Sequence, residues 1–156
     1  MPLPFDDRGL LPPGVHDATL EEIDAALGRF RKSTRRITLM ANLRAYVEEL
    51  RKTGWDFQLV IDGSFVMTAI DEPNDIDAIL VLPADWDFLA SLRPWLYNLL
   101  DKRATRRDHK FDVIAVANGS VAESEAFALF GGTRAHWCDL FGWDHSTTKG
   151  LIRIIP

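Results

Sequence analysis

Two aspartates separated by a single residue, Asp75 and Asp77, open an apolar segment that runs to Leu82. On a β-strand, side chains at positions i and i+2 point to the same face, so these two carboxylates would lie next to each other. Adjacent carboxylates on a buried strand repel each other and lose hydration, and a divalent cation between them offsets that cost. Oxygen ligands favour magnesium or manganese, and magnesium commonly binds together with a phosphate group. The pair therefore predicts a metal site.

Two further features flank this pair. A Gly63-Ser64 turn follows an apolar segment, and Asp112 lies within another apolar segment downstream. Glycine has no Cβ and lets the backbone turn tightly against a ligand, while a serine offers its hydroxyl and backbone N–H to a phosphate. The alternative is that Asp75 and Asp77 are only turn and strand-edge residues. In that case, the free energy needed to bury the Asp77 carboxylate inside an apolar segment would have no explanation.

The remaining sequence indicates the elements that position these residues. Thr19 and Glu22 have the spacing of a helix capping box, and so do Ser120 and Glu123. Hydrophobic periodicity and turn signals predict helices over residues 19–31, 34–53, 85–102 (divided or kinked at Pro94) and 120–131. They predict strands over residues 57–61, 75–82, 111–116 and 151–155. This order predicts an α/β or α+β fold in which helices flank one small mixed sheet.

Length and composition fit one domain over residues 1–156, with an extended leader at 1–18 and the motifs within 34–118. The N-terminus lacks the basic and apolar parts of a signal peptide, and no apolar run reaches the length of a membrane span, so we expect no membrane partner. Cys138 is the one cysteine, which excludes an internal disulfide and favours a reducing, cytoplasmic setting.

The net charge is −5, which argues against broad, sequence-independent binding to nucleic acid. Two basic clusters could still form local patches, or could simply be solvated helix ends and loops. They comprise Arg29, Arg31, Lys32, Arg35 and Arg36, then Lys102, Arg103, Arg106, Arg107 and Lys110.

In its order of motifs, the chain resembles the nucleotidyltransferase superfamily typified by DNA polymerase beta. The resemblance rests on Gly63-Ser64, then Asp75-Ile76-Asp77 on a strand, then Asp112 on a later strand, and it covers roughly residues 34–118. Residues 11–16 (LPPGVH) extend it, less specifically, towards a set of stand-alone bacterial members whose activity is largely unassigned.

The resemblance implies a role for each of these residues. Gly63 and Ser64 would hold the triphosphate of a nucleoside triphosphate such as ATP. Asp75 and Asp77 would bind two Mg²⁺ (or Mn²⁺) ions, and Asp112 would complete the second metal site. Asp112 or a water would accept the proton of the attacking hydroxyl. Asp77→Ala is expected to abolish transfer while the fold is kept.

The expected activity is transfer of a nucleoside monophosphate from a triphosphate to a hydroxyl of a protein, an RNA end or a small molecule. Larger superfamily members carry a further helical domain that selects the base and acceptor, and too few residues follow Asp112 for one. That selection would fall to the leader, the C-terminal segment, a second copy in a homodimer or a partner protein. A toxin–antitoxin pair is one setting by analogy, and tRNA is a possible acceptor. The alternative is a non-catalytic module that binds a nucleotide or a protein.

Several other residues have the chemistry for a site, and each also has a structural interpretation. His16 could contact substrate, although packing on the surface is preferred. Lys149 could bring an amine to a phosphate or could belong to a solvated turn, and Asp62 could act in catalysis or in the turn. The other candidates are a zinc group of unusual spacing, a packed or nucleophilic thiol, and tryptophans that could stack a base. These are His136, Cys138, Asp139 and His145 for zinc, Cys138 for the thiol, and Trp86, Trp95, Trp137 and Trp143 for stacking.

Overall fold

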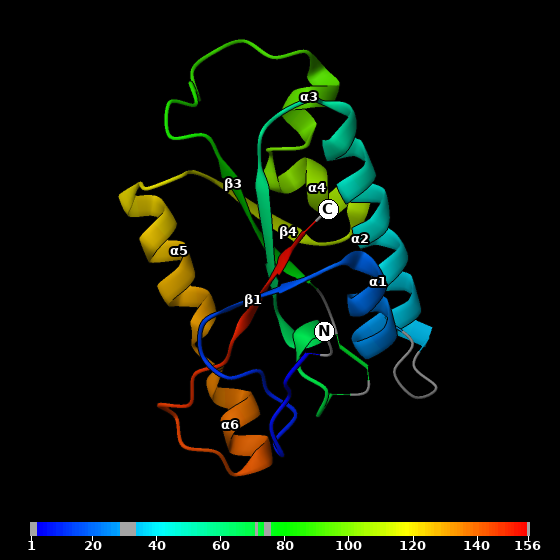
Figure 1. Ribbon diagram of the computed structural model, residues 1–156, viewed down its shortest axis with the longest axis vertical. Helices are drawn as coiled ribbons and strands as arrows, with labels where there is room; N and C mark the ends of the chain where they lie inside the picture. The colour runs from blue at the N-terminus through cyan, green and yellow to red at the C-terminus, as the bar shows by residue number, and fades with distance from the viewer. Residues whose placement is uncertain (1–2, 29–33, 71, 74–75, 156) are drawn as a thin grey trace.

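The computed structural model describes residues 3–28, 34–70, 72–73 and 76–155, and its centre is a mixed five-stranded sheet (Figure 1). The strand order is β1-β5-β2-β3-β4. The bounds are Val15–Ala18 (β1), Gln58–Asp62 (β2), Asp77–Leu82 (β3), Asp112–Ala117 (β4) and Leu151–Ile154 (β5). The β1–β5 and β3–β4 pairs are parallel, while β2 runs antiparallel to both of its neighbours. The predicted mixed sheet with flanking helices is confirmed.

Helices cover both faces of the sheet because side chains along each strand alternate between two apolar layers. Leu59 and Ile61 of β2 pack on the side of α2 (Thr34–Lys52), together with α1 (Leu20–Ile23). Val60, between them, packs with α5 (Val121–Gly131) on the other side. In Figure 1, α5 accordingly lies on the opposite side of the strands from α1 and α2.

Side-chain caps explain where α1 and α5 begin. The predicted capping box forms at α1, where the Thr19 hydroxyl accepts from the Glu22 backbone N–H at 3.1 Å. At α5, Ser120 caps the Glu123 N–H in the same way. The first helix is nevertheless shorter than predicted, since α1 passes into a π-helical turn, η1 (Asp24–Gly28), and residues 29–31 lie outside the described part of the chain.

The helix predicted over residues 85–102 is wrong. After β3 the chain runs without regular structure to α3 (Pro94–Asn98), and a separate helix, α4, spans Lys102–His109. Proline lacks the N–H that a helix interior needs but suits the first helical turn, so Pro94 begins α3 instead of kinking a longer helix. Asp101 begins α4 by accepting from the Ala104 N–H at 3.0 Å. In the second basic cluster, Lys102, Arg103, Arg106 and Arg107 therefore lie on α4, and Lys110 follows its last residue.

Arg36 belongs neither to a surface patch nor to a solvated helix end, the two interpretations open for its basic cluster, because it is fully buried. Its guanidinium donates to the backbone carbonyls of Phe65 (2.6 Å), Met67 (2.8 Å) and Ile70. A further bond, of 3.3 Å, reaches Leu27 O. Arg36 thus joins α2 to the segment that follows the Gly-Ser turn. Arg35 is exposed, and Arg29, Arg31 and Lys32 lie outside the described residues.

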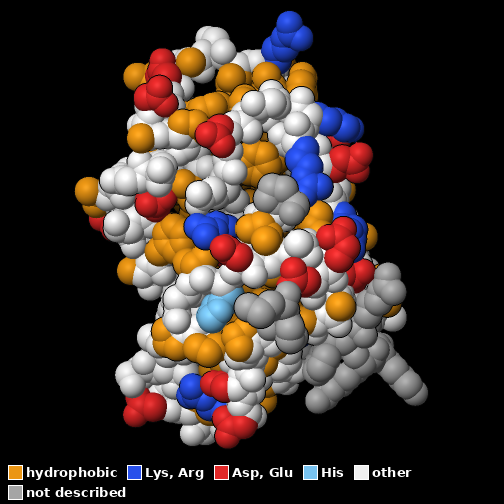
Figure 2. All heavy atoms as spheres, in the orientation of Figure 1, with side chains coloured by type: hydrophobic (Ala, Val, Ile, Leu, Met, Phe, Trp, Pro, Cys, Tyr) orange, Lys and Arg blue, Asp and Glu red, His pale blue; other side chains and the backbone are white. Residues whose placement is uncertain are grey.

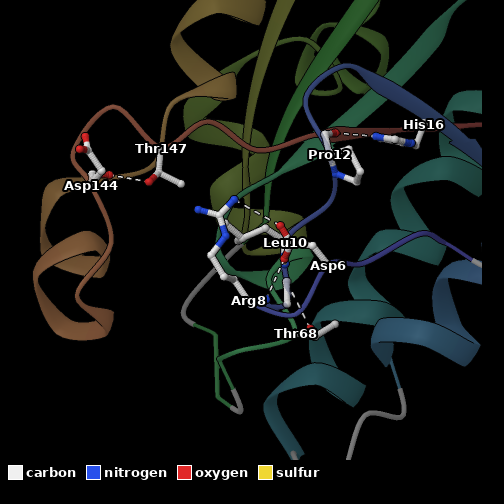
Figure 3. A network of polar contacts seen from close by, with 9 residues as sticks. Asp6, Arg8, Leu10, Pro12, His16, Thr68, Asp144 and Thr147 are labelled. Carbon is white, nitrogen blue, oxygen red and sulfur yellow. Dashed lines mark hydrogen bonds and ion pairs between the residues drawn. The ribbon is translucent and has the colours of Figure 1, made fainter.

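The leader is part of the fold. β1 adds to the edge of the sheet beside β5, and the residues before it fold against the segment that follows the Gly-Ser turn. Asp6 accepts from the Leu10 N–H at 3.0 Å, and the Thr68 N–H donates to Gly9 O at 2.9 Å (Figure 3). Leu10 packs in a small apolar cluster with Met67 and Trp137, so the leader also contacts the region of α6 (Ala135–Phe141).

The surface carries a mixture of charges. On the face shown in Figure 2, basic, acidic and apolar side chains are interspersed over its whole height. Among the described helices, none is both long and apolar enough to cross a membrane.

Candidate functional site

Three aspartates form a row across one end of the sheet. Asp62 of β2 is paired in register with Asp77 of β3, which is itself paired with Asp112 of β4. Register partners on neighbouring strands project from the same face, and Cα atoms of directly opposed residues lie roughly 5 Å apart. This face is the one covered by α5, because Val60 and Ile79 lie two residues from Asp62 and Asp77 and belong to its apolar layer. The sheet therefore brings together Asp77 and Asp112 as predicted, and adds Asp62.

The row opens into a cavity of about 360 Å³. Its wall includes the three aspartates and the Gly63-Ser64 turn, together with cationic and aromatic side chains from the second half of the chain. The cationic and aromatic members are Lys102, Lys149, Arg134, Phe130, His136 and Trp137. A pocket with acidic groups on one wall and cations around it can hold a metal ion with an anionic ligand.

Gly63 sits at the strand end with a backbone conformation that favours glycine. Its φ is 92° and its ψ is −178°, in a region where a Cβ would be strained. Ser64 follows as the first residue of a short 3₁₀ helix, η2 (Ser64–Val66), and is buried at the cavity wall. The turn predicted to hold a phosphate is thus formed, and it adjoins the row of aspartates.

Asp62 forms a buried ion pair with Lys149, and each residue is only 5–6% exposed. The Lys149 ammonium also donates to Phe130 O, near the end of α5, at 2.9 Å. Burial raises the pKa of the Asp62 carboxyl above its ordinary value, and the Lys149 charge acts against that rise. Lys149 is therefore not in a solvated turn, and its charge is committed to the carboxylate beside Gly63.

The other two aspartates contact exposed arginines. Asp112 Oδ1 lies 3.1 Å from Arg106 Nη1 of α4. Asp77 Oδ2 lies 4.0 Å from Arg134 Nη2, at the residue before α6. Sequence reasoning treated Arg106 only as part of a basic cluster and did not single out Arg134. Neither arginine belongs to a motif, and only the fold brings each to its aspartate.

The donor set at this site fits a divalent cation. Asp112 Oδ1 is buried and accepts no hydrogen bond from the described residues, so the arginine contact does not satisfy its acceptor capacity. With Asp77 it offers two hard oxygen ligands, of the kind that magnesium and manganese prefer. Asp75, the third predicted ligand, lies outside the described residues. Within the part described, no group of three or more His, Cys, Asp or Glu side chains is placed to hold a metal.

The four residues considered from the sequence as zinc ligands, His136, Cys138, Asp139 and His145, do not form such a group either. His136 lines the cavity, but Cys138 is buried and contacts Thr133 O at 3.9 Å. His145 pairs instead with Asp139, at 2.6 Å on the surface. With these contacts, the four side chains do not surround one point at which a zinc ion could bind.

The other candidates are also placed. His16 lies on the edge strand and bonds Pro12 O at 2.7 Å (Figure 3), while Trp137 alone among the considered tryptophans lines the cavity. Trp86 packs edge-on against Trp55, with 5.0 Å between the ring centroids, and Trp143 packs with the leader. Trp95 is exposed on α3. A packing role therefore accounts for Trp86 and Trp143.

Fold and site together define a mixed α/β protein with an aspartate row at the mouth of a cation-lined pocket. The chain matches DUF6932, described as a family of unknown function, over residues 3–155, and it belongs to that family. Comparison with curated proteins and with solved structures found no match.

Proposed function

We propose that this protein is a minimal nucleotidyltransferase with a polymerase-beta-like catalytic core. It would move a nucleoside monophosphate from a nucleoside triphosphate to a hydroxyl group. The observation that carries the proposal is the register of β3 and β4, which sets Asp77 beside Asp112 in a pocket shared with the Gly63-Ser64 turn. Carboxylates on adjacent strands and a phosphate-binding turn at the same cavity are the parts that metal-assisted phosphoryl transfer needs.

Each part of the pocket has a role in this reaction. Asp77 and Asp112, with Asp75 as the expected third ligand, would hold Mg²⁺ or Mn²⁺, which neutralises phosphate charge and lowers the pKa of the attacking hydroxyl. The Gly63 backbone and the Ser64 hydroxyl would bind phosphate oxygens at the strand end. Cations around the pocket, of which Lys102 is one, would offset the charge of the triphosphate.

The bond changes follow from this placement. The acceptor oxygen attacks the α-phosphorus, the bond from that phosphorus to the bridging oxygen breaks, and pyrophosphate leaves. The hydroxyl proton passes to Asp112 or to a water, and Asp112 suits this role because its Oδ1 is buried at the cavity wall and accepts no hydrogen bond from the described residues. The acceptor hydroxyl belongs to a protein, an RNA end or a small molecule.

Calorimetry with nucleoside triphosphates tests the proposal. We expect binding that requires Mg²⁺ or Mn²⁺ and that Asp77→Asn weakens by at least tenfold, because a metal ligand is lost while side-chain volume is kept. Asp108→Asn is the matched control, since Asp108 is exposed on α4 and pairs with Arg107 outside the pocket. Binding that ignores both the metal and Asp77→Asn would instead favour the non-catalytic module.

A further inference from the structure

Both described candidate metal ligands are held by arginines that are largely exposed to solvent. The Arg106 side chain on Asp112 is 59% exposed, and the Arg134 side chain on Asp77 is 70% exposed. The Asp112 and Asp77 side chains are only 24% and 15% exposed, but each guanidinium is already largely solvated, so an arginine that leaves its carboxylate gains water in its place. These two contacts therefore exchange easily.

The third aspartate provides a contrast within the same row. Lys149 and Asp62 are both 6% exposed in their side chains, and the ammonium is further held by a carbonyl of α5. Separating a buried pair leaves uncompensated charges, which costs far more than separating an exposed one. One carboxylate of the row is thus paired with a buried cation, whereas the cations on the two candidate metal ligands are solvated and can leave.

The arginines are also placed to reach an anion in the cavity. Arg134 lines the cavity itself. Arg106 lies four residues after Lys102, which lines it, and residues four apart share one face of a helix. Arginine binds phosphate oxygens through its planar fork of N–H donors, in charge-assisted hydrogen bonds of the same kind as those it makes to a carboxylate.

The charged side chains around the cavity favour the binding of a highly charged anion. Among the described residues, three carboxylates, those of Asp62, Asp77 and Asp112, lie close to four cationic side chains. The cations are Lys102, Arg106, Arg134 and Lys149. Once divalent cations take over Asp77 and Asp112, both arginines lose these partners, and the described side chains around the pocket carry an excess of positive charge.

We propose that Arg106 and Arg134 are polyphosphate-binding residues that rest on Asp112 and Asp77 and exchange these carboxylates for phosphate oxygens when divalent cations bind. The ligand class is the polyphosphate of a nucleoside triphosphate, so this inference rests on the proposed function. It assigns each arginine two successive partners. In the resting protein the arginines compete with metal, and in the loaded protein they retain the triphosphate.

Opposite effects on two ligands test this exchange. In Arg106→Gln and in Arg134→Gln, Mn²⁺ alone should bind about two- to fivefold more tightly, since a competing ion pair is gone. Inorganic tripolyphosphate with saturating Mg²⁺ should bind about tenfold or more weakly, since a charge-assisted contact is lost. Isothermal titration calorimetry measures both on the full chain, and tripolyphosphate removes any dependence on the base.

Arg107→Gln is the matched control, because Arg107 neighbours Arg106 on α4 but pairs with Asp108 away from the row. It should change neither affinity. Weakening of both ligands together would mean that the arginines only support the fold, and an unchanged tripolyphosphate affinity would mean that they only block metal; either result overturns the proposal. If the opposite shifts occur but no nucleotide is ever transferred, the exchange stands and the proposed transferase activity fails.

Discussion

Replacing Arg36 by methionine should destabilise the protein more than any substitution at an exposed arginine. Methionine fills a similar volume but donates no hydrogen bond, so the carbonyls of Phe65, Met67 and Ile70 would stay buried without their donor, as would Leu27 O. A buried acceptor that loses its donor costs about 1–3 kcal/mol, and part of that cost relaxes when water enters. We expect about 3–5 kcal/mol of lost unfolding free energy.

Urea unfolding followed by circular dichroism measures this loss directly. In a domain of this size, about 4 kcal/mol corresponds to a fall in Tm of roughly 8–16 °C. Arg35→Met is the control, because Arg35 is the exposed neighbour on the same helix, and it should stay within about 1 kcal/mol of the parent.

The structure also predicts which segment Arg36→Met destabilises first. Amide hydrogen exchange in Arg36→Met should accelerate first over residues 65–70, whose carbonyls lose the guanidinium, before it does so in β2 or β3. A loss below about 1 kcal/mol, equal to that of Arg35→Met, would show that the buried guanidinium does not support this segment.

Three further outcomes are expected. Lys149→Met should lower the unfolding free energy measured in urea by about 3–5 kcal/mol, because it leaves the Asp62 carboxylate buried without its cation. Adding Asp62→Asn should recover at least half of that loss, and a double variant no more stable than Lys149→Met would contradict this. Burial lowers the pKa of His109, so this residue binds fewer protons in the folded protein than in the unfolded chain. Its contribution to stability is therefore present above the pKa of the unfolded chain and is lost as the pH falls through the pKa of the folded protein. His109→Phe should therefore flatten the stability–pH curve on the acid side of about pH 6.5, and an unchanged slope would refute that assignment. Gly63→Ala, strained at a φ of 92°, should weaken triphosphate binding in calorimetry, and parent-like affinity would argue against a phosphate role for the turn.

Local signals predicted much of the fold. The apolar periodicity of α2, the capping box at Thr19 and the serine cap at Ser120 each concern residues only a few positions apart, so the sequence alone shows them. The helix predicted over residues 85–102 was wrong because Phe88 and Leu89 are exposed, so the first part of that segment has no core face to support a helix.

The features of the site that could not be predicted from the sequence depend on contacts between residues far apart in the chain. Lys149 and Asp62 are 87 residues apart, and no spacing rule links them. The acceptors of Arg36 in residues 65–70 are backbone carbonyls 29–34 positions away, which no side-chain pattern could indicate. Asp77 and Asp112, by contrast, were recognisable because a charged residue in an apolar strand is costly unless it has a purpose.

Metal-dependent transfer of a labelled nucleotide tests the central claim most directly. The full chain is incubated with triphosphates labelled at the α-phosphate, with Mg²⁺ or Mn²⁺, and with bacterial protein and RNA fractions, and incorporated label is counted. We predict label on one acceptor class that requires the metal and falls by at least a hundredfold in Asp77→Asn and Asp112→Asn, while Asp108→Asn matches the parent. Equal incorporation by the parent and both site variants, each folded by circular dichroism, would contradict the assignment of this aspartate row as the catalytic centre.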